Sequence, residues 1–496
     1  MANHEGWPEQ SNARQKPSRR FYRGLVIALI TIPLLFLAID RLRYELRSYV
    51  LLTHLVDPQA SGPLLRFESN AVSVEDVTIA TKDGPVPARL YIPLGISKPR
   101  GIVVLPGIHH LGIYDPRFVN FSQALAASGF AVLTPVLASL ADYHVDAASI
   151  PTIGSSPAWL ERRLGTGPVT VIALSFSGGL ALLAACDPQY APHIRALVLF
   201  GGYENLERVS RFLATGQEEF PDGRVVPAPV HDYGASVFVY AHLSQFFDPK
   251  DIPAAHEALK YWLWEEPQNA KPWLDKLSPP ARELLDALMS RRIDLVRPQL
   301  LAAIHADAAE LASLSPDGQI AQLRTPVFIL HGATDTVIPP AESLWLAKEV
   351  PRREVRTVLI TPAFTHVDLQ HKASWVDQLR LVDFIAAVLQ EASQRDPQNL
   401  FATPPLQSSV YCSGTHPLRF FAMRARIEIG YVCCEIRSRE QTIQQALGCH
   451  GQDRFDFSSS WTLQKERVRD CEKSGVKESV AKRTSIRHAD AQLLHQ

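Results

Sequence analysis

Residues 169–179 read VTVIALSFSGG, and residues 180–186 continue with LALLAAC. The first six residues are almost all apolar and rich in β-branched side chains, which indicates a buried strand. The apolar run after the two glycines is typical of a buried helix. The stretch therefore predicts a strand, a sharp turn and a helix, with a serine hydroxyl presented at the bend.

Two serines compete for the place at the bend. Strand and helix backbones come close there, so the residues two before and two after the serine must be small. For Ser175 these residues are Ala173 and Ser177, and for Ser177 they are Ser175 and Gly179. Ser175 directly follows a strand of ordinary length and has Gly178 in the first turn of the helix. We therefore take Ser175 as the candidate nucleophile and keep Ser177 as the alternative.

A serine hydroxyl becomes an effective nucleophile when a base accepts its proton. The candidate base is His366, in the loop after the expected strand EVRTVLI at 354–360. The candidate acid is Asp335, in the loop after PVFILHG at 326–332, where it would orient the imidazole and stabilise its protonated form. Each residue follows a strand, so all three are expected at one edge of a parallel sheet.

The oxyanion that forms during acyl transfer requires hydrogen-bond donors, each contributing about 2.7–4 kcal/mol in the transition state. We expect the backbone N–H groups of Phe176 and Ile108 to be these donors. Ile108 lies in the segment PGIHHLG, which follows an apolar strand. The neighbouring His109 and His110 do not indicate a metal site, because adjacent side chains rarely face one ion and no acidic partner is suitably spaced. No metal is expected there.

The rest of the chain sets these loops in an α/β fold. Residues 72–203 begin with a β-hairpin pattern and continue with short apolar strands alternating with helical segments, and this alternation returns in residues 323–394. It predicts a doubly wound, mostly parallel sheet. Residues 204–322 have helical periodicity instead, and we expect them to form an inserted helical cap. Three aromatic residues of this cap are expected to roof an apolar acyl pocket: Tyr261, Trp262 and Trp264.

The N-terminal part of the chain has the pattern of a membrane anchor. Residues 1–20 are polar and basic, and residues 24–39 carry no charge. We expect a single transmembrane signal anchor over residues 21–40, with a cleaved signal peptide as the alternative. More Lys and Arg precede this span than directly follow it, so the head is expected in the cytoplasm and the catalytic domain outside it. Residues 41–71 are expected to be a connector.

The last hundred residues and the overall composition are less informative. Residues 395–496 lack clear periodicity and contain five of the six cysteines, and we expect a poorly ordered tail there. The formal net charge is −1, with no block of Lys or Arg resembling a nucleic-acid-binding arm. Nucleic acid is therefore not an expected partner. The expected partners are a membrane, through residues 21–40, and the small ester or acyl substrate of the serine chemistry described above.

Residues 72 to about 393 resemble the α/β-hydrolase superfamily. Four segments carry the resemblance: VVLPG at 103–107, ALSFSGG at 173–179, ILHGATD at 329–335 and AFTHVDL at 363–369. Within the superfamily, the oxyanion loop and the Asp-Pro-Arg after it are similar to dienelactone-hydrolase-like and esterase-like members, although dienelactone hydrolases use a cysteine nucleophile. The resemblance implies acyl-enzyme hydrolysis without a cofactor. The alternatives are a non-catalytic binding protein of this fold and an acyltransferase using the same triad.

Overall fold

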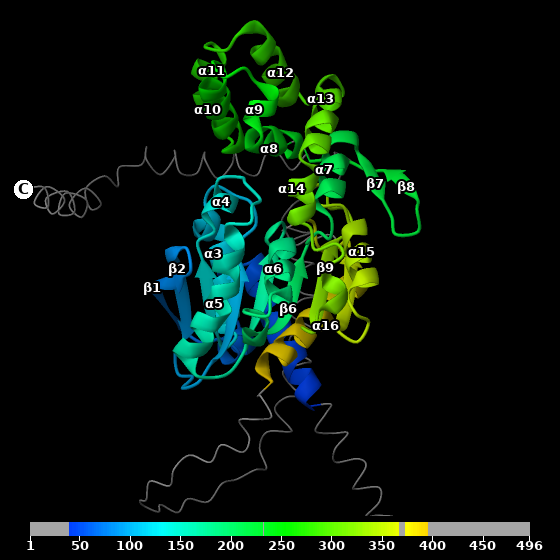
Figure 1. Ribbon diagram of the computed structural model, residues 1–496. Coiled ribbons are helices and arrows are strands. Elements are labelled where there is room, and N and C mark those ends of the chain that lie inside the picture. Colours follow the sequence, from blue (N-terminus) through cyan, green and yellow to red (C-terminus); the bar gives the residue numbers. More distant parts are fainter. Residues whose placement is uncertain (1–38, 232, 367–372, 395–496) are drawn as a thin grey trace, which may run out of the picture. The chain divides into compact units, whose positions relative to one another are not determined.

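An eight-stranded sheet with the strand order β1-β2-β4-β3-β5-β6-β9-β10 organises the computed structural model, which describes residues 39–231, 233–366 and 373–394 (Figure 1). The strands are β1 (Val72–Thr81), β2 (Gly84–Pro93), β3 (Arg100–Leu105), β4 (Phe130–Pro135), β5 (Val169–Leu174), β6 (Ile194–Phe200), β9 (Val327–Gly332) and β10 (Val355–Thr361). β1 and β2 form the predicted antiparallel hairpin, and β2 is also antiparallel to β4. The remaining neighbours are parallel, so the mostly parallel sheet is confirmed.

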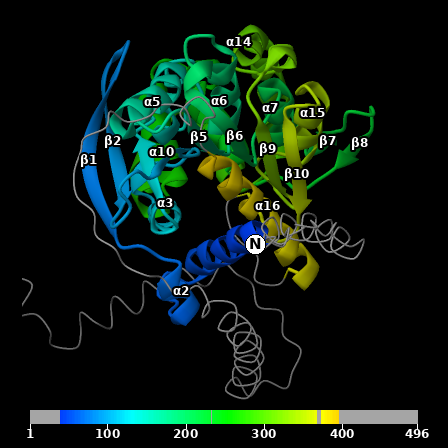
Figure 2. The same cartoon turned by 90° about the horizontal axis from the view of Figure 1, so that it is seen from below.

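The central strands are buried on both faces, which explains their almost continuous apolar sequences. Successive side chains alternate between two apolar layers, as in Ile102 and Val103 of β3. One face is covered by α5 (Ser149–Leu164), α6 (Ser177–Cys186) and α15 (Ala341–Glu349). The other is covered by α3 (Pro116–Ala127), α16 (Trp375–Ser393) and a helix over residues 39–56. Figure 2 shows the sheet between these two helix layers.

Local sequence signals mark where α3 and α16 begin. The Asp115 carboxylate accepts hydrogen bonds from the N–H groups of Arg117 and Phe118, and Pro116 occupies the first helical position of α3. Ser374 caps α16 in the same manner by accepting from the N–H of Asp377. The short elements between the strands and long helices are α2 (Pro63–Phe67), α4 (Ala138–Ala141), and the 3₁₀ turns η1 (Gly112–Tyr114), η2 (Ala191–His193) and η3 (Ile320–Gln322).

Residues 204–322 are mainly helical. Their helices are α7 (Leu206–Thr215), α8 (Gly234–Ala241), α9 (Leu243–Phe246), α10 (Ile252–Leu263), α11 (Pro267–Leu274), α12 (Pro279–Met289), α13 (Ile293–Ala306) and α14 (Ala308–Ser313). Figure 1 shows α8 to α13 gathered above the sheet, close to α4. The segment also contains a small hairpin of β7 (Gln217–Glu219) and β8 (Val225–Pro227), which helical periodicity did not predict.

The helix over residues 39–56 packs against α16, so the expected connector begins as a docked helix. The Ser48 hydroxyl donates to the carbonyl oxygen of Val382 at 2.7 Å, and Arg41 pairs with Asp383 at 2.6 Å. Leu51 of the same helix is buried.

Three predicted segments fall largely or wholly outside the described residues. They are the head at 1–20, the membrane span at 21–40 except for its last two residues, and the tail at 395–496. Within the described ranges, no helix has both the length and the apolar character that crossing a bilayer requires.

Candidate active site

A sharp turn joins β5 to α6, and Ser175 lies at its bend. The φ of Ser175 is +58°, in the left-handed region that residues other than glycine rarely adopt. Ala173 and Ser177 are both fully buried, which shows why small residues are needed on either side. A Cβ at Gly178 would lie 3.0 Å from the Cα of Gly202, so the helix and the loop after β6 approach backbone to backbone. This is the strand–turn–helix that the sequence predicted.

The structure brings Ser175, His366 and Asp335 together from three loops. The Ser175 Oγ lies 2.7 Å from Nε2 of His366, and Nδ1 of His366 lies 2.7 Å from Oδ2 of Asp335. These distances fit a serine hydroxyl that donates to Nε2 and an Nδ1–H that donates to the carboxylate. Ser175 is 3% exposed and Asp335 4%, whereas 15% of the His366 side chain is exposed, so in this relay of three residues the imidazole is the group most open to solvent.

The environment of Asp335 keeps its carboxylate ionised. Its Oδ1 accepts from the N–H groups of Val337 and Ile338 at 2.8 and 3.1 Å. Burial by itself raises the pKa of Asp335, but the charge of His366 and hydrogen bonds from His331 and His366 outweigh it, so the pKa of this carboxyl lies well below its ordinary value. A carboxylate that stays negative can stabilise an imidazolium beside it.

His331 is a second partner of Asp335 that the sequence analysis missed. Its Nε2 lies 2.9 Å from the carbonyl oxygen of Ile338 and 3.3 Å from Oδ2 of Asp335, while Nδ1 lies 2.6 Å from the Ser343 hydroxyl. The Nε2–H is therefore shared between the carbonyl and the carboxylate. A polar residue at the end of the otherwise apolar strand VFILHG was the available signal.

The two predicted oxyanion donors flank Ser175. Phe176 is the next residue in the chain and precedes α6. A Cβ at Gly107 would lie 3.0 Å from the Cβ of Ser175 and 3.6 Å from its Oγ, so the loop that carries Ile108 touches the nucleophile because residue 107 is glycine. Within the described residues, neither the Ile108 nor the Phe176 N–H donates to a protein acceptor.

The alternative nucleophile, Ser177, occupies a different environment. Its hydroxyl is fully buried and donates to the carbonyl oxygen of Leu174 at 2.8 Å, with the carbonyl oxygen of Leu105 at 3.4 Å. The hydroxyl proton is thus held by the backbone. Ser177 has the contacts of a residue that stabilises the turn, whereas Ser175 has the contact with a base.

Parts of the cap lie close to this site. The ring of Trp264 stacks on His110 of the oxyanion loop with centroids 5.1 Å apart, and Tyr261 meets Trp264 edge-on. Tyr233 directly precedes α8, and its pKa is raised first by burial and next by the negative charge of Asp335. The role of the cap aromatic residues as the roof of an acyl pocket remains a prediction.

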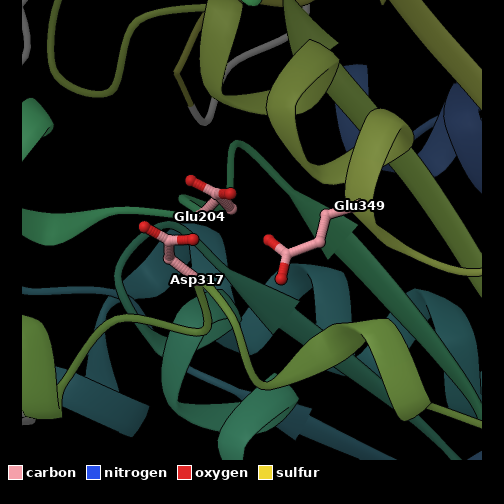
Figure 3. Close-up of side chains that lie close together, drawn as sticks. All are labelled: Glu204, Asp317 and Glu349. Carbon is pink, nitrogen blue, oxygen red and sulfur yellow. The ribbon is translucent and has the colours of Figure 1, made fainter.

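One group of carboxylates among the described residues has the spacing of a metal site. Glu204, Asp317 and Glu349 have oxygen atoms within 4.8 Å of one another (Figure 3). Each has a donor from the protein: Arg208 for Glu204, the amide of Asn205 for Asp317, and the N–H of Gly318 for Glu349. Burial, and then a hydrogen bond with Glu349, raise the pKa of Glu204 to about 7. A proton on Glu204 would ease the repulsion between Glu204 and Glu349, and these donors stabilise the three carboxylates without a metal ion.

Comparisons with known proteins return similarity of structure alone. No protein-family model and no curated protein matches the sequence. Among solved structures, the acylaminoacyl peptidase of Pyrococcus horikoshii has 12% identity and a TM-score of 0.38 over 66% of this chain, which spans 42% of the peptidase. An esterase of Pyrobaculum calidifontis has 17% identity and a TM-score of 0.35, with 71% of this chain and 90% of the esterase covered.

A third similar structure is the 2-hydroxy-6-oxo-6-phenylhexa-2,4-dienoate hydrolase of Rhodococcus sp. strain RHA1. It has 16% identity and a TM-score of 0.36, with 65% of this chain and 99% of the hydrolase covered. The features that define this fold are those of the chain itself. They are the mostly parallel sheet, the strained serine between β5 and α6, and the order serine, acid, histidine along the sequence.

Proposed function

We propose that this chain is a serine hydrolase that cleaves a carboxylic ester or a related acyl bond through an acyl-enzyme. The observation that carries the proposal is the relay from the Ser175 hydroxyl through His366 to Asp335, with both heavy-atom distances at 2.7 Å. A hydroxyl, an imidazole and an ionised carboxylate in this order are what acyl transfer by serine requires.

In the first half-reaction, Ser175 Oγ attacks the carbonyl carbon while its proton passes to Nε2 of His366. The imidazolium that results is stabilised by Asp335, whose pKa is lowered and which therefore remains negative. The tetrahedral intermediate places its oxyanion where the N–H groups of Ile108 and Phe176 can donate to it. His366 then gives the proton to the leaving alcohol, and the acyl group stays on Ser175.

The second half-reaction repeats these steps with water. His366 takes a proton from water, the resulting hydroxide attacks the acyl carbon, and the same two N–H groups stabilise the second oxyanion. Collapse of this intermediate releases the carboxylic acid and returns the proton to Ser175. Every proton that is released in these steps is accepted by a residue of the chain, by the leaving alcohol or by the product. The reaction as written requires no metal or organic cofactor.

The direct test is hydrolysis of p-nitrophenyl esters of increasing acyl length by the full chain. We expect turnover by the wild type, loss of turnover in Ser175→Ala, and a folded, active Ser177→Ala control with reduced thermal stability. Turnover that survives in Ser175→Ala contradicts the proposal. The absence of turnover in the wild type, together with tight binding of the esters, favours the non-catalytic alternative, and ester products formed with added alcohols favour acyl transfer.

We also propose that residues 21–40 anchor the chain in a membrane, with the hydrolase unit on the extracytoplasmic side. Support comes from the uncharged stretch at 24–39 and the basic residues before it. The helix over residues 39–56 overlaps the end of this span and packs on the core, which would hold the hydrolase unit near the bilayer. We expect the full chain to stay in membranes washed with alkaline carbonate and a chain lacking residues 1–40 to be released, and equal release of both contradicts the anchor.

A further inference from the structure

The oxyanion loop is attached to the cap through His110, two residues after Ile108. The His110 ring stacks on Trp264, with centroids 5.1 Å apart, and its Nδ1 lies 3.4 Å from the hydroxyl oxygen of Tyr143. Burial lowers the pKa of His110, which favours a neutral ring at pH 7. The side chain is therefore held from two sides by residues outside its own loop.

Tyr143 joins the loop to α10. Its hydroxyl donates to the carbonyl oxygen of Leu263, the last residue of α10, at 2.9 Å, and its side chain is buried. Because the single phenolic proton goes to Leu263, the phenol oxygen is left to accept from Nδ1–H of His110. One hydroxyl thus connects the oxyanion loop and the end of a cap helix, and each donor has an acceptor.

The backbone of Tyr143 has a φ of +60°, the left-handed conformation common just after a helix. At the ends of α5 and α7 the corresponding residues are Gly165 and Gly216, which adopt it without steric cost. Glu265 and Arg291 also adopt this conformation, so strain alone does not single out Tyr143. Tyr143 is distinguished by its side chain. A glycine at this position would relieve the backbone strain, but it would remove both contacts of the phenol.

We propose that Tyr143 is a positioning residue that fixes the oxyanion loop, and with it the N–H of Ile108, by linking His110 to Leu263. The inference rests on the proposed function, because the task of the loop is to donate to an oxyanion. It assigns the cap a part in transition-state stabilisation, since movement of α10 would move the donor.

The test compares Tyr143→Phe with Tyr240→Phe in the full chain. Tyr240 is the matched control, because its buried hydroxyl also joins cap to core, at 2.9 Å from Asp142 and 3.0 Å from His256. Neither of those partners belongs to the oxyanion loop. We expect Tyr143→Phe to lower kcat about tenfold, or ~1.4 kcal/mol, with KM within twofold, whereas Tyr240→Phe keeps kcat within twofold.

Hydrogen–deuterium exchange provides a readout that does not depend on activity. The peptide spanning residues 106–112 should exchange faster in Tyr143→Phe and at the wild-type rate in Tyr240→Phe. Equal exchange in this peptide for both variants overturns the positioning role, as does an equal loss of kcat that follows the loss of Tm. Ser175→Ala is measured alongside: activity that survives there contradicts the proposed function, while activity lost there but unchanged in Tyr143→Phe contradicts the positioning role alone.

Discussion

Replacement of Gly107 by alanine tests the contact between the oxyanion loop and the nucleophile. The added methyl group would lie 3.0 Å from the Cβ of Ser175, 3.4 Å from the carbonyl oxygen of Leu174 and 3.6 Å from the Ser175 Oγ. An unstrained carbon contact needs 3.4 Å or more, so the loop and Ser175 must separate by a few tenths of an ångström. Neither neighbour can yield easily, since Leu174 O is backbone and Ser175 is fixed in a strained turn.

The separation displaces the N–H of Ile108 from the oxyanion. Loss of one such donor is worth about 2.7–4 kcal/mol, which corresponds to a factor of about 10² to 10³ in rate. We expect Gly107→Ala to lower kcat for a p-nitrophenyl ester about 100-fold, with a smaller change in KM, because the donor acts mainly in the transition state.

The matched control is Gly62→Ala, in a part of the chain where an added Cβ meets nothing within 4 Å. We expect its kcat to equal that of the wild type. If Gly107→Ala retains the wild-type kcat while remaining folded, the placement of Ile108 as an oxyanion donor is refuted.

Three other changes have defined outcomes. Asp335→Asn should lower kcat by about 10⁴-fold without unfolding the chain, because the amide no longer holds the imidazole in the required tautomer, as steady-state kinetics will show. Because the pKa of Glu204 is raised, the folded chain binds the proton of this carboxyl more tightly than the unfolded chain does. The free energy of unfolding therefore falls as the pH rises from ~4.3 through about 7. Glu349→Gln removes one cause of the raised pKa, so it should lessen the fall in Tm between pH 5 and 8. Ser48→Ala should lower the free energy of unfolding by about 1 kcal/mol by removing the bond to Val382, and should leave kcat unchanged; a lower kcat would link this helix to the site.

The elements of the sheet and the three relay residues were predictable because their signals are local. β5 and β9 are short, mostly apolar runs buried on both faces, β10 is partly exposed, and a loop with one relay residue follows each of the three strands. Ser175, Asp335 and His366 are far apart in sequence, yet parallel strands bring their carboxyl ends to one edge. The choice of Ser175 over Ser177 followed from strand length. The structure adds the contact between the Ser175 hydroxyl and His366 that a nucleophile needs.

The residues that sequence reasoning missed act through contacts between distant segments. His331 looked like part of a strand, and its bond to Asp335 depends on the turn that follows. Tyr143 lies after a four-residue helix, and only the fold brings its hydroxyl to Leu263, 120 residues later. The small hairpin of β7 and β8 has three-residue strands, too short to show a periodicity of their own.

The most direct measurement is covalent labelling of the full chain with a fluorophosphonate, followed by mass spectrometry of the labelled peptide. We predict one equivalent of label on Ser175, no label on Ser175→Ala and normal labelling of Ser177→Ala. Label on Ser177, or a folded wild-type chain that the reagent does not modify, contradicts the assignment of Ser175 as the activated nucleophile.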